Sequence, residues 1–122
     1  MMLSMIQKFK KGQIWLANLN PNKGAEPGKT RPVLILQDQT LLDVVHPTTV
    51  IIPLTTNIME DVYPLRVRVL PRNQLKKESD LLIDQIRAID NKRLINGPLL
   101  SLNHEQMQVV YRAVSEVIGA EW

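Results

Sequence analysis

Residues 64–70 read PLRVRVL, and this stretch predicts the fold more clearly than any other part of the chain. Its aliphatic residues alternate with Arg66 and Arg68. Alternation with a period of two is typical of a β-strand that packs one face on a core and presents the other to solvent. We therefore expect a strand here, with both arginines on the face away from the core.

Four more segments have the composition of strands. They are rich in β-branched or aliphatic residues and are separated by clusters of Pro, Gly, Asn and Asp. These segments are residues 12–19 (GQIWLANL), 31–37 (RPVLILQ), 48–54 (TTVIIPL) and 79–89 (SDLLIDQIRAI). Five short strands bounded by turn residues predict an antiparallel arrangement.

A convincing helical period occurs near the end of the sequence, where apolar residues recur at spacings of three, four and seven from Met107 to Ile118. Ser101 or Asn103 is the expected N-cap of this helix, and Gly119 its end. A shorter helical turn is expected to begin at Asp90. The economical architecture is a single α+β domain over residues 1–122, mainly β, in which a small bent antiparallel sheet or partly open barrel is completed by short helices and an amphipathic C-terminal helix.

Composition narrows the classes of protein to be considered. The chain has 122 residues, no cysteine and a formal net charge of +3. A core of this size needs no disulfide or metal, and the lack of cysteine excludes thiolate zinc sites and cysteine nucleophiles. The sequence contains no stretch of membrane-spanning length, so we expect a cytoplasmic protein, and the positive charge favours an anionic partner.

Few side chains suited to catalysis are present. The two histidines, His46 and His104, are far apart in the sequence and are expected at the surface. Paired-histidine metal spacing, a phosphate-binding glycine loop and a nucleophile elbow are all missing from the sequence. Arginine, threonine and a few carboxylates remain, and no metal or other cofactor is expected.

The most informative polar residue is Arg31, within GAEPGKTRPVLIL at residues 24–36. Pro32 biases Arg31 toward extended geometry, so the arginine is expected where a glycine-containing loop meets a strand. A guanidinium is planar, stays charged and suits two-point recognition of phosphate. The alternative is a surface salt bridge, for example with Glu26.

Three separated motifs resemble the MazF/PemK family of toxin endoribonucleases. They are KKGQIWLANLNPNKGAEPGKTRPVLILQ (residues 10–37), HPTTVIIPLTTN (46–57) and LLIDQIRAIDNKRL (81–94). The resemblance covers nearly the whole chain in the family's order. It implies an SH3-like antiparallel barrel with appended helices, a homodimer, metal-independent cleavage of single-stranded RNA and a neutralising antitoxin partner.

The resemblance also implies site residues. Arg31 and Thr55 take the places of the catalytic pair, with Thr56 as a substitute because the threonine doublet could shift by one. Glu26 matches the family's loop acid, and Asp84 stands where some members carry a functional acid; among apolar neighbours, it would need a partner if it pointed inward. The further candidates for RNA contact are Lys29, Thr56 and Gln37.

The chemistry of such a site can be outlined from the residue types. Arg31 is a poor general base at its ordinary pKa, so we expect it to stabilise charge on the phosphate while Thr55 donates a hydrogen bond. The base stays open between Glu26, Asp84 and water. Two other functions stay open as well: a gyrase-poisoning toxin with the same barrel, and a non-catalytic interaction barrel.

Overall fold

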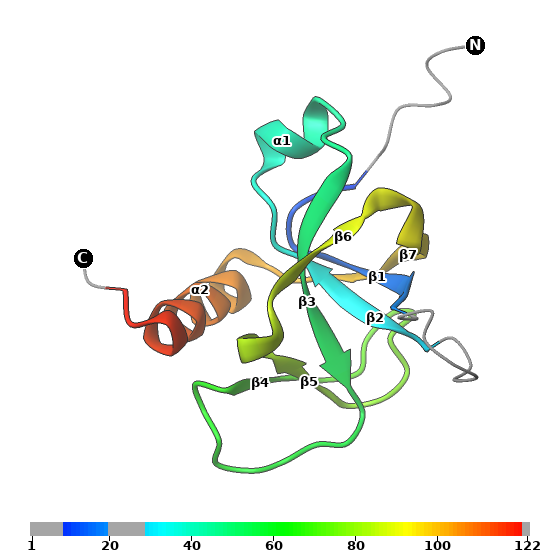
Figure 1. Ribbon diagram of the computed structural model, residues 1–122. Coiled ribbons are helices and arrows are strands. Elements are labelled where there is room, and N and C mark those ends of the chain that lie inside the picture. The colour runs from blue at the N-terminus through cyan, green and yellow to red at the C-terminus, as the bar shows by residue number, and fades with distance from the viewer. Residues whose placement is uncertain (1–8, 20–28, 121–122) are drawn as a thin grey trace, which may run out of the picture.

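The computed structural model describes residues 9–19 and 29–120. Within them a bent antiparallel sheet carries a long helix on one side (Figure 1). The strands are β1 (Gln13–Asn18), β2 (Thr30–Ile35), β3 (Thr48–Thr55), β4 (Arg66–Val69), β5 (Ser79–Leu82), β6 (Arg87–Asp90) and β7 (Leu94–Ser101). The helices are α1 (Gln39–Asp43), α2 (His104–Ile118) and the short 3-10 turns η2 (Ile83–Gln85) and η3 (Asn91–Arg93).

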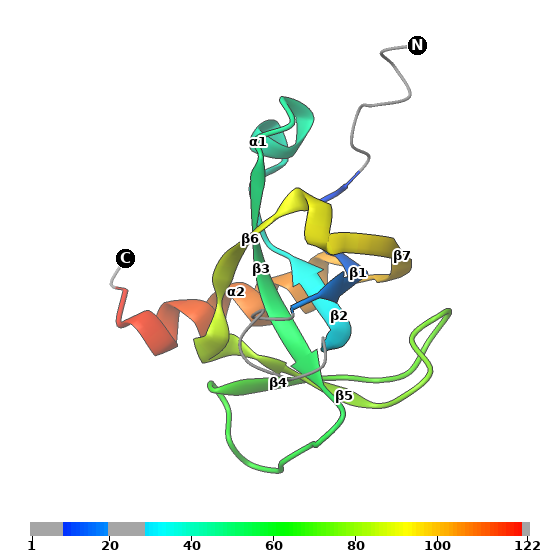
Figure 2. The same ribbon diagram turned by 45° about the vertical axis from the view of Figure 1, so that its right-hand side comes forward.

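Strand β3 lies at the centre of the sheet. The strand order is β4-β5-β3-β2-β1-β7, and β6 pairs with β3 as well. All of these pairings are antiparallel. The sheet bends strongly, but it is not closed (Figures 1 and 2). The predicted fold class is therefore confirmed, with an open rather than a fully closed barrel.

Strand β2 is buried on both faces, which explains why its sequence is a continuous apolar run. Leu34 packs in a core cluster with the apolar face of α2, whereas Val33 and Ile35 pack in a second cluster with Phe9 and Leu42. Since successive side chains of a strand point to opposite faces, one strand serves both clusters. In β2 both core clusters thus begin within three residues of Arg31, at Val33 and Leu34.

The C-terminal helix confirms its prediction in detail. Asn103 is the N-cap, and its side chain and that of Gln106 form a reciprocal capping box. Gly119 ends the helix in the left-handed conformation, with φ of 70°. Asp90 likewise caps η3 by accepting from the Lys92 N–H at 2.8 Å, as predicted. No helix in residues 9–19 and 29–120 is long and apolar enough to span a membrane.

The predicted strand over residues 79–89 is wrong as a single element. The chain leaves β5 after Leu82, makes the η2 turn and then forms β6, which pairs with another part of β3. The apolar run continues through the break because Ile83 is buried within the core although it is not in a strand. The apolar composition of residues 79–89 therefore reflects burial of the side chains and not one continuous strand.

Besides η2, two elements were not predicted. Strand β7 contains Gly97 and Pro98, residues that normally argue against a strand, but β7 lies at the end of the strand order and its register with β1 shifts. Gly97 is required there because a Cβ would lie 2.6 Å from Cδ2 of Trp15. Helix α1 is only five residues long, and the Asp38 side chain caps it.

Candidate functional site

The strand register brings Arg31 and Thr55 together. Strands β2 and β3 pair Ile35 with Ile51 and Val33 with Pro53. Continuing this register by two residues places Arg31 opposite Thr55, and opposite residues of an antiparallel pair point to the same face. The two predicted catalytic residues, which lie 24 positions apart in the sequence, therefore become cross-strand neighbours.

A pocket of about 200 Å³ opens at this point of the sheet. It is lined by the end of β3, the start of β2, and Ser79 at the start of β5. The lining residues are Lys29, Thr30, Arg31, Pro32, Leu54, Thr55, Thr56 and Ser79. Four predicted site residues, Lys29, Arg31, Thr55 and Thr56, thus share one pocket, with two cations and two hydroxyl groups.

The contacts of Arg31 and Thr55 leave donors for a ligand. Arg31 Nη1 donates to the carbonyl of Leu54 at 3.4 Å, which ties the guanidinium to the end of β3. A guanidinium has five N–H donors, so this contact leaves most of them for another acceptor. The Thr55 hydroxyl accepts from the Asn57 N–H at 3.1 Å, and its own proton can be donated into the pocket.

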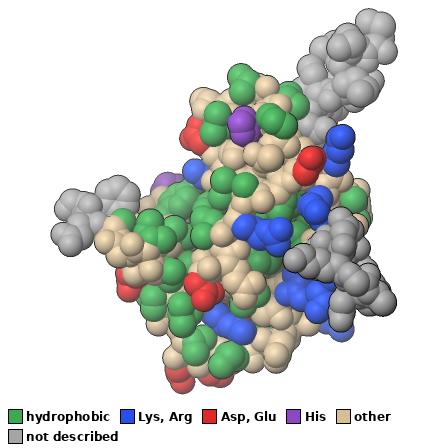
Figure 3. Space-filling view, viewed as in Figure 1, with side chains coloured by type: hydrophobic (Ala, Val, Ile, Leu, Met, Phe, Trp, Pro, Cys, Tyr) green, Lys and Arg blue, Asp and Glu red, His purple; other side chains and the backbone are tan. Residues whose placement is uncertain are grey.

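The surroundings of the pocket are basic. Lys29 and Thr56 are exposed beside the half-buried Arg31. Lys and Arg side chains gather on the side of the molecule where β1 ends and β2 begins (Figure 3). Such a surface attracts polyanions before any specific contact forms.

The structure does not bring the other predicted site residues to the pocket. Gln37 is buried; its Nε2 donates to the Thr48 carbonyl at 2.9 Å and its Oε1 accepts from the Val50 N–H at 3.1 Å. The prediction of an RNA contact by Gln37 therefore finds no support. Asp84 does not point inward but is exposed in η2, outside the pocket lining. Glu26 lies outside the described residues.

An unpredicted buried acid, Asp80, lies beside this site. Its side chain is 1% exposed and accepts from Arg68 Nε at 2.6 Å, from Arg66 Nη1 at 3.2 Å and from the Met59 N–H at 2.9 Å. Burial alone would raise the pKa of Asp80, but these hydrogen bonds outweigh it and hold the pKa below its ordinary value. The two arginines were expected to face solvent; they are instead partly buried and bind Asp80. The Arg-x-Arg alternation was the one sequence signal for a buried acid.

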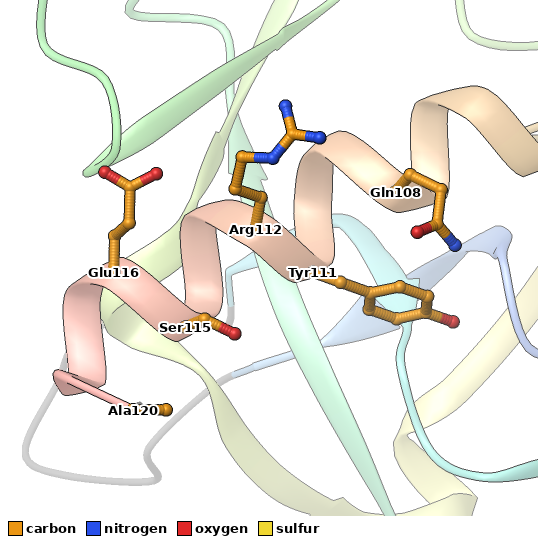
Figure 4. A pocket seen from close by; sticks show the side chains of 6 residues that line it. All are labelled: Gln108, Tyr111, Arg112, Ser115, Glu116 and Ala120. Carbon is orange, nitrogen blue, oxygen red and sulfur yellow. The ribbon is translucent and has the colours of Figure 1, made fainter. Parts of the chain in front are cut away.

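A larger pocket of about 400 Å³ lies along α2 (Figure 4). It is lined by Gln108, Tyr111, Arg112, Ser115, Glu116 and Ala120. None of the predicted site residues lines it. Among the described residues, no group of three or more His, Asp or Glu side chains is placed to hold a metal ion.

Known proteins share this fold. The model of the family described as PemK-like, MazF-like toxin of type II toxin-antitoxin system matches residues 10–118. A protein named endoribonuclease MazF from Staphylococcus epidermidis is 33% identical over 112 residues, which are 91% of this chain and 92% of that protein. Two solved structures have a TM-score of 0.74: the Mycobacterium tuberculosis toxin MazF-mt6 and a MazE-MazF structure from Deinococcus radiodurans. Their identities are 23% and 21%; they cover 90% and 91% of this chain, and the alignments span 99% and 96% of theirs.

Fold and site together define a small β-rich domain whose bent sheet carries a basic, hydroxyl-containing pocket at the ends of its central strands. The family match spans most of the described chain. The protein belongs to the PemK-like, MazF-like toxins of type II toxin-antitoxin systems.

Proposed function

We propose that this protein is an endoribonuclease that cleaves single-stranded RNA and serves as the toxin of a type II toxin-antitoxin module. The observation that carries the proposal is the pairing of Arg31 with Thr55 in one basic pocket. A relative that is 33% identical over most of both chains is named an endoribonuclease, which supports the same reading. The pocket is where the scissile phosphate binds.

The proposed reaction uses the substrate's own 2′-hydroxyl as nucleophile. Its oxygen attacks the adjacent phosphorus, the bond from phosphorus to the 5′-oxygen breaks, and the products are a 2′,3′-cyclic phosphate and a 5′-hydroxyl. Negative charge builds on the phosphate oxygens during this step. Arg31 stabilises that charge through its free N–H donors, and Thr55 donates one hydrogen bond to the same phosphate.

Two protons move in the reaction. The 2′-hydroxyl loses a proton to a base, and the departing 5′-oxygen gains one from an acid. We assign the base to Glu26 or to water and not to Asp84, because Asp84 does not line the pocket. Arg31 stays protonated and acts through its charge. A nucleophile supplied by the 2′-hydroxyl restricts the substrate to RNA, and the proposed cleavage needs no metal ion.

The proposed partners follow from the family and the charge. A cognate antitoxin with an acidic, apolar tail would cover the basic pocket and exclude RNA. A MazE-MazF structure from Deinococcus radiodurans is among the fold relatives. We further propose a homodimer that acts in the cytoplasm. Light scattering at micromolar concentration tests the dimer, and a monomer there contradicts it.

The experiment that tests the function is incubation of the purified protein with a long single-stranded RNA in the presence of EDTA. Cleavage to fragments with 2′,3′-cyclic phosphate ends is expected. The same RNA with 2′-O-methyl groups should stay intact, and so should DNA of the same sequence. Trapping of DNA gyrase without RNA cleavage would instead favour the gyrase-poisoning toxin, and neither result would favour a non-catalytic barrel.

A further inference from the structure

Asp80 lies in the same cross-strand row as the proposed catalytic pair. Strands β3 and β5 pair Thr55 with Asp80, and strands β4 and β5 pair Arg68 with Asp80. Since β2 continues the row with Arg31, these four side chains lie on one face of four neighbouring strands in the order Arg31, Thr55, Asp80, Arg68. Thr55 therefore has Arg31 as its cross-strand neighbour on one side and Asp80 on the other.

Asp80 and its arginines hold the segment that follows Thr55. In Figure 1 this segment is the start of the long loop that leaves the arrowhead of β3 and leads to β4. Its Met59 N–H donates to Asp80 Oδ2 at 2.9 Å. Arg66 Nη1 donates to the Asn57 carbonyl at 2.7 Å, and Arg68 Nη2 donates to the Met59 carbonyl at 3.1 Å.

The carboxylate fixes both arginines in the positions that these contacts require. Arg66 and Arg68 each bind Asp80 and loop atoms at once, so the loop contacts depend on where Asp80 holds the guanidinium groups. Arg68 Nη2 also binds Glu60 Oε2 at 3.0 Å. Residues 57–60 thus form four hydrogen bonds with Asp80, Arg66 and Arg68. Because Asp80 is buried, its own bonds to Met59, Arg66 and Arg68 are partly shielded from competing water.

The held segment in turn orients Thr55. The Asn57 N–H donates to the Thr55 hydroxyl oxygen at 3.1 Å, and this bond decides where the hydroxyl can direct its own proton. Asn57 is also the residue whose carbonyl Arg66 holds. Movement of the segment would therefore turn or release the Thr55 hydroxyl at the edge of the Arg31 pocket.

We propose that Asp80 is a positioning residue for RNA cleavage: through Arg66, Arg68 and the Met59 N–H it fixes residues 57–60, so that Thr55 donates its hydroxyl proton toward the phosphate bound by Arg31. The inference rests on the proposed function. Misplacement of a reacting group by about 1 Å can lower a rate about 100-fold, so the loss expected on releasing the segment is about 10-fold to 100-fold in kcat, with KM within about twofold.

Asp80→Asn tests the proposal, with Glu78→Gln as the matched control. Glu78 binds the same Arg68 at 2.8 Å, but its side chain is 40% exposed and forms no hydrogen bond to residues 57–60, so Glu78→Gln should cleave like the wild type. Cleavage of a labelled single-stranded RNA is measured well below the melting temperature of each variant. Where Asp80→Asn does not fold, Arg66→Gln replaces it, because Arg66→Gln removes the Asn57 contact and leaves Asp80 paired with Arg68.

Two readouts separate positioning from a general structural role. In a Thr55→Ala background Asp80→Asn should cause little further loss of kcat, because the residue through which it acts is already gone. Amide hydrogen exchange should also become faster at Asn57 and Met59 and stay unchanged in α2. An equal loss of kcat in both backgrounds would overturn the proposal, and so would unchanged exchange at both amides.

RNA cleavage by the wild type distinguishes a failure of the proposed function from a failure of the positioning role of Asp80. A wild-type protein that cuts no RNA overturns the proposed function and the positioning role with it. A wild type that cuts RNA, beside an Asp80→Asn protein that is folded and cuts within twofold of it, overturns the positioning role alone.

Discussion

Replacing Asp80 by Asn should destabilise the protein at neutral pH and much less at low pH. The Asp80 side chain is 1% exposed, whereas those of Arg66 and Arg68 are 19% and 26% exposed. Removing one partner of a buried ion pair typically costs about 3–5 kcal/mol. Since water can reach both arginines in part, we expect the lower end, about 3 kcal/mol. At about 4 °C per kcal/mol for a chain of this size, the melting temperature should fall by about 12 °C.

The pH dependence has a definite sign. The hydrogen bonds from the two arginines and the Met59 N–H hold the pKa of folded Asp80 below its ordinary value despite burial, which opposes them. A carboxyl group with a depressed pKa in the folded state contributes stability above its unfolded pKa of about 3.9 and loses it as the pH falls toward the folded value. The difference between wild type and Asp80→Asn should thus be constant from about pH 7 to pH 5 and shrink below about pH 4.

Urea unfolding followed by circular dichroism at pH 7, 5, 4 and 3 measures this difference directly. Other carboxyl groups titrate in both proteins and cancel in the comparison. Glu78→Gln serves as the control, because a pair with a 40% exposed acid is worth less than about 1 kcal/mol. A difference between wild type and Asp80→Asn that is as large at pH 3 as at pH 7, or that is missing at pH 7, would refute the reasoning.

Three further predictions concern the site and the fold. Arg31→Lys should cleave RNA little better than Arg31→Ala, because an ammonium keeps the charge but loses the planar two-point contact. Thr55→Ala should lose less activity than Arg31→Ala, because the hydrogen bond that it removes is neutral. Single-turnover kinetics of the three variants give their order. Gly97→Ala should cost about 1–3 kcal/mol and shift the fluorescence of Trp15, since the new Cβ would lie 2.6 Å from the ring. Asn103→Ala should cost about 1 kcal/mol by removing the capping box of α2, as measured by thermal unfolding.

Much of the fold could be predicted because local sequence and burial agree along most of the chain. The helix containing Val110 shows the expected periodicity, the strand containing Val33 shows the expected apolar run, and both pack in the core. Strand β7 could not be predicted, because the register shift with β1 and the close approach of Trp15 to Gly97 are tertiary features. The break at Ile83 was hidden for the same kind of reason, since a buried turn has the composition of a buried strand.

The site was predictable where a residue type or a family motif suggests a chemistry. Arg31 was singled out by its residue type and its place before Pro32, and Thr55 by the family resemblance; the register of β2 and β3 explains why they meet. Gln37 was predicted to contact RNA, but both ends of its amide bind backbone groups. Asp80 was missed because its importance comes from two arginines on a neighbouring strand, which no local pattern around Asp80 reveals.

The measurement that tests the central claim most directly is single-turnover cleavage of single-stranded RNA by Arg31→Ala in the presence of EDTA, with its thermal unfolding measured beside it. Arg31 is tied to the rest of the chain by a 3.4 Å contact with the Leu54 carbonyl, so its loss should change stability little. Removal of a donor that stabilises transition-state charge should lower the cleavage rate about 100-fold to 1,000-fold. A folded Arg31→Ala protein that cuts RNA within a few-fold of the wild type would contradict the account.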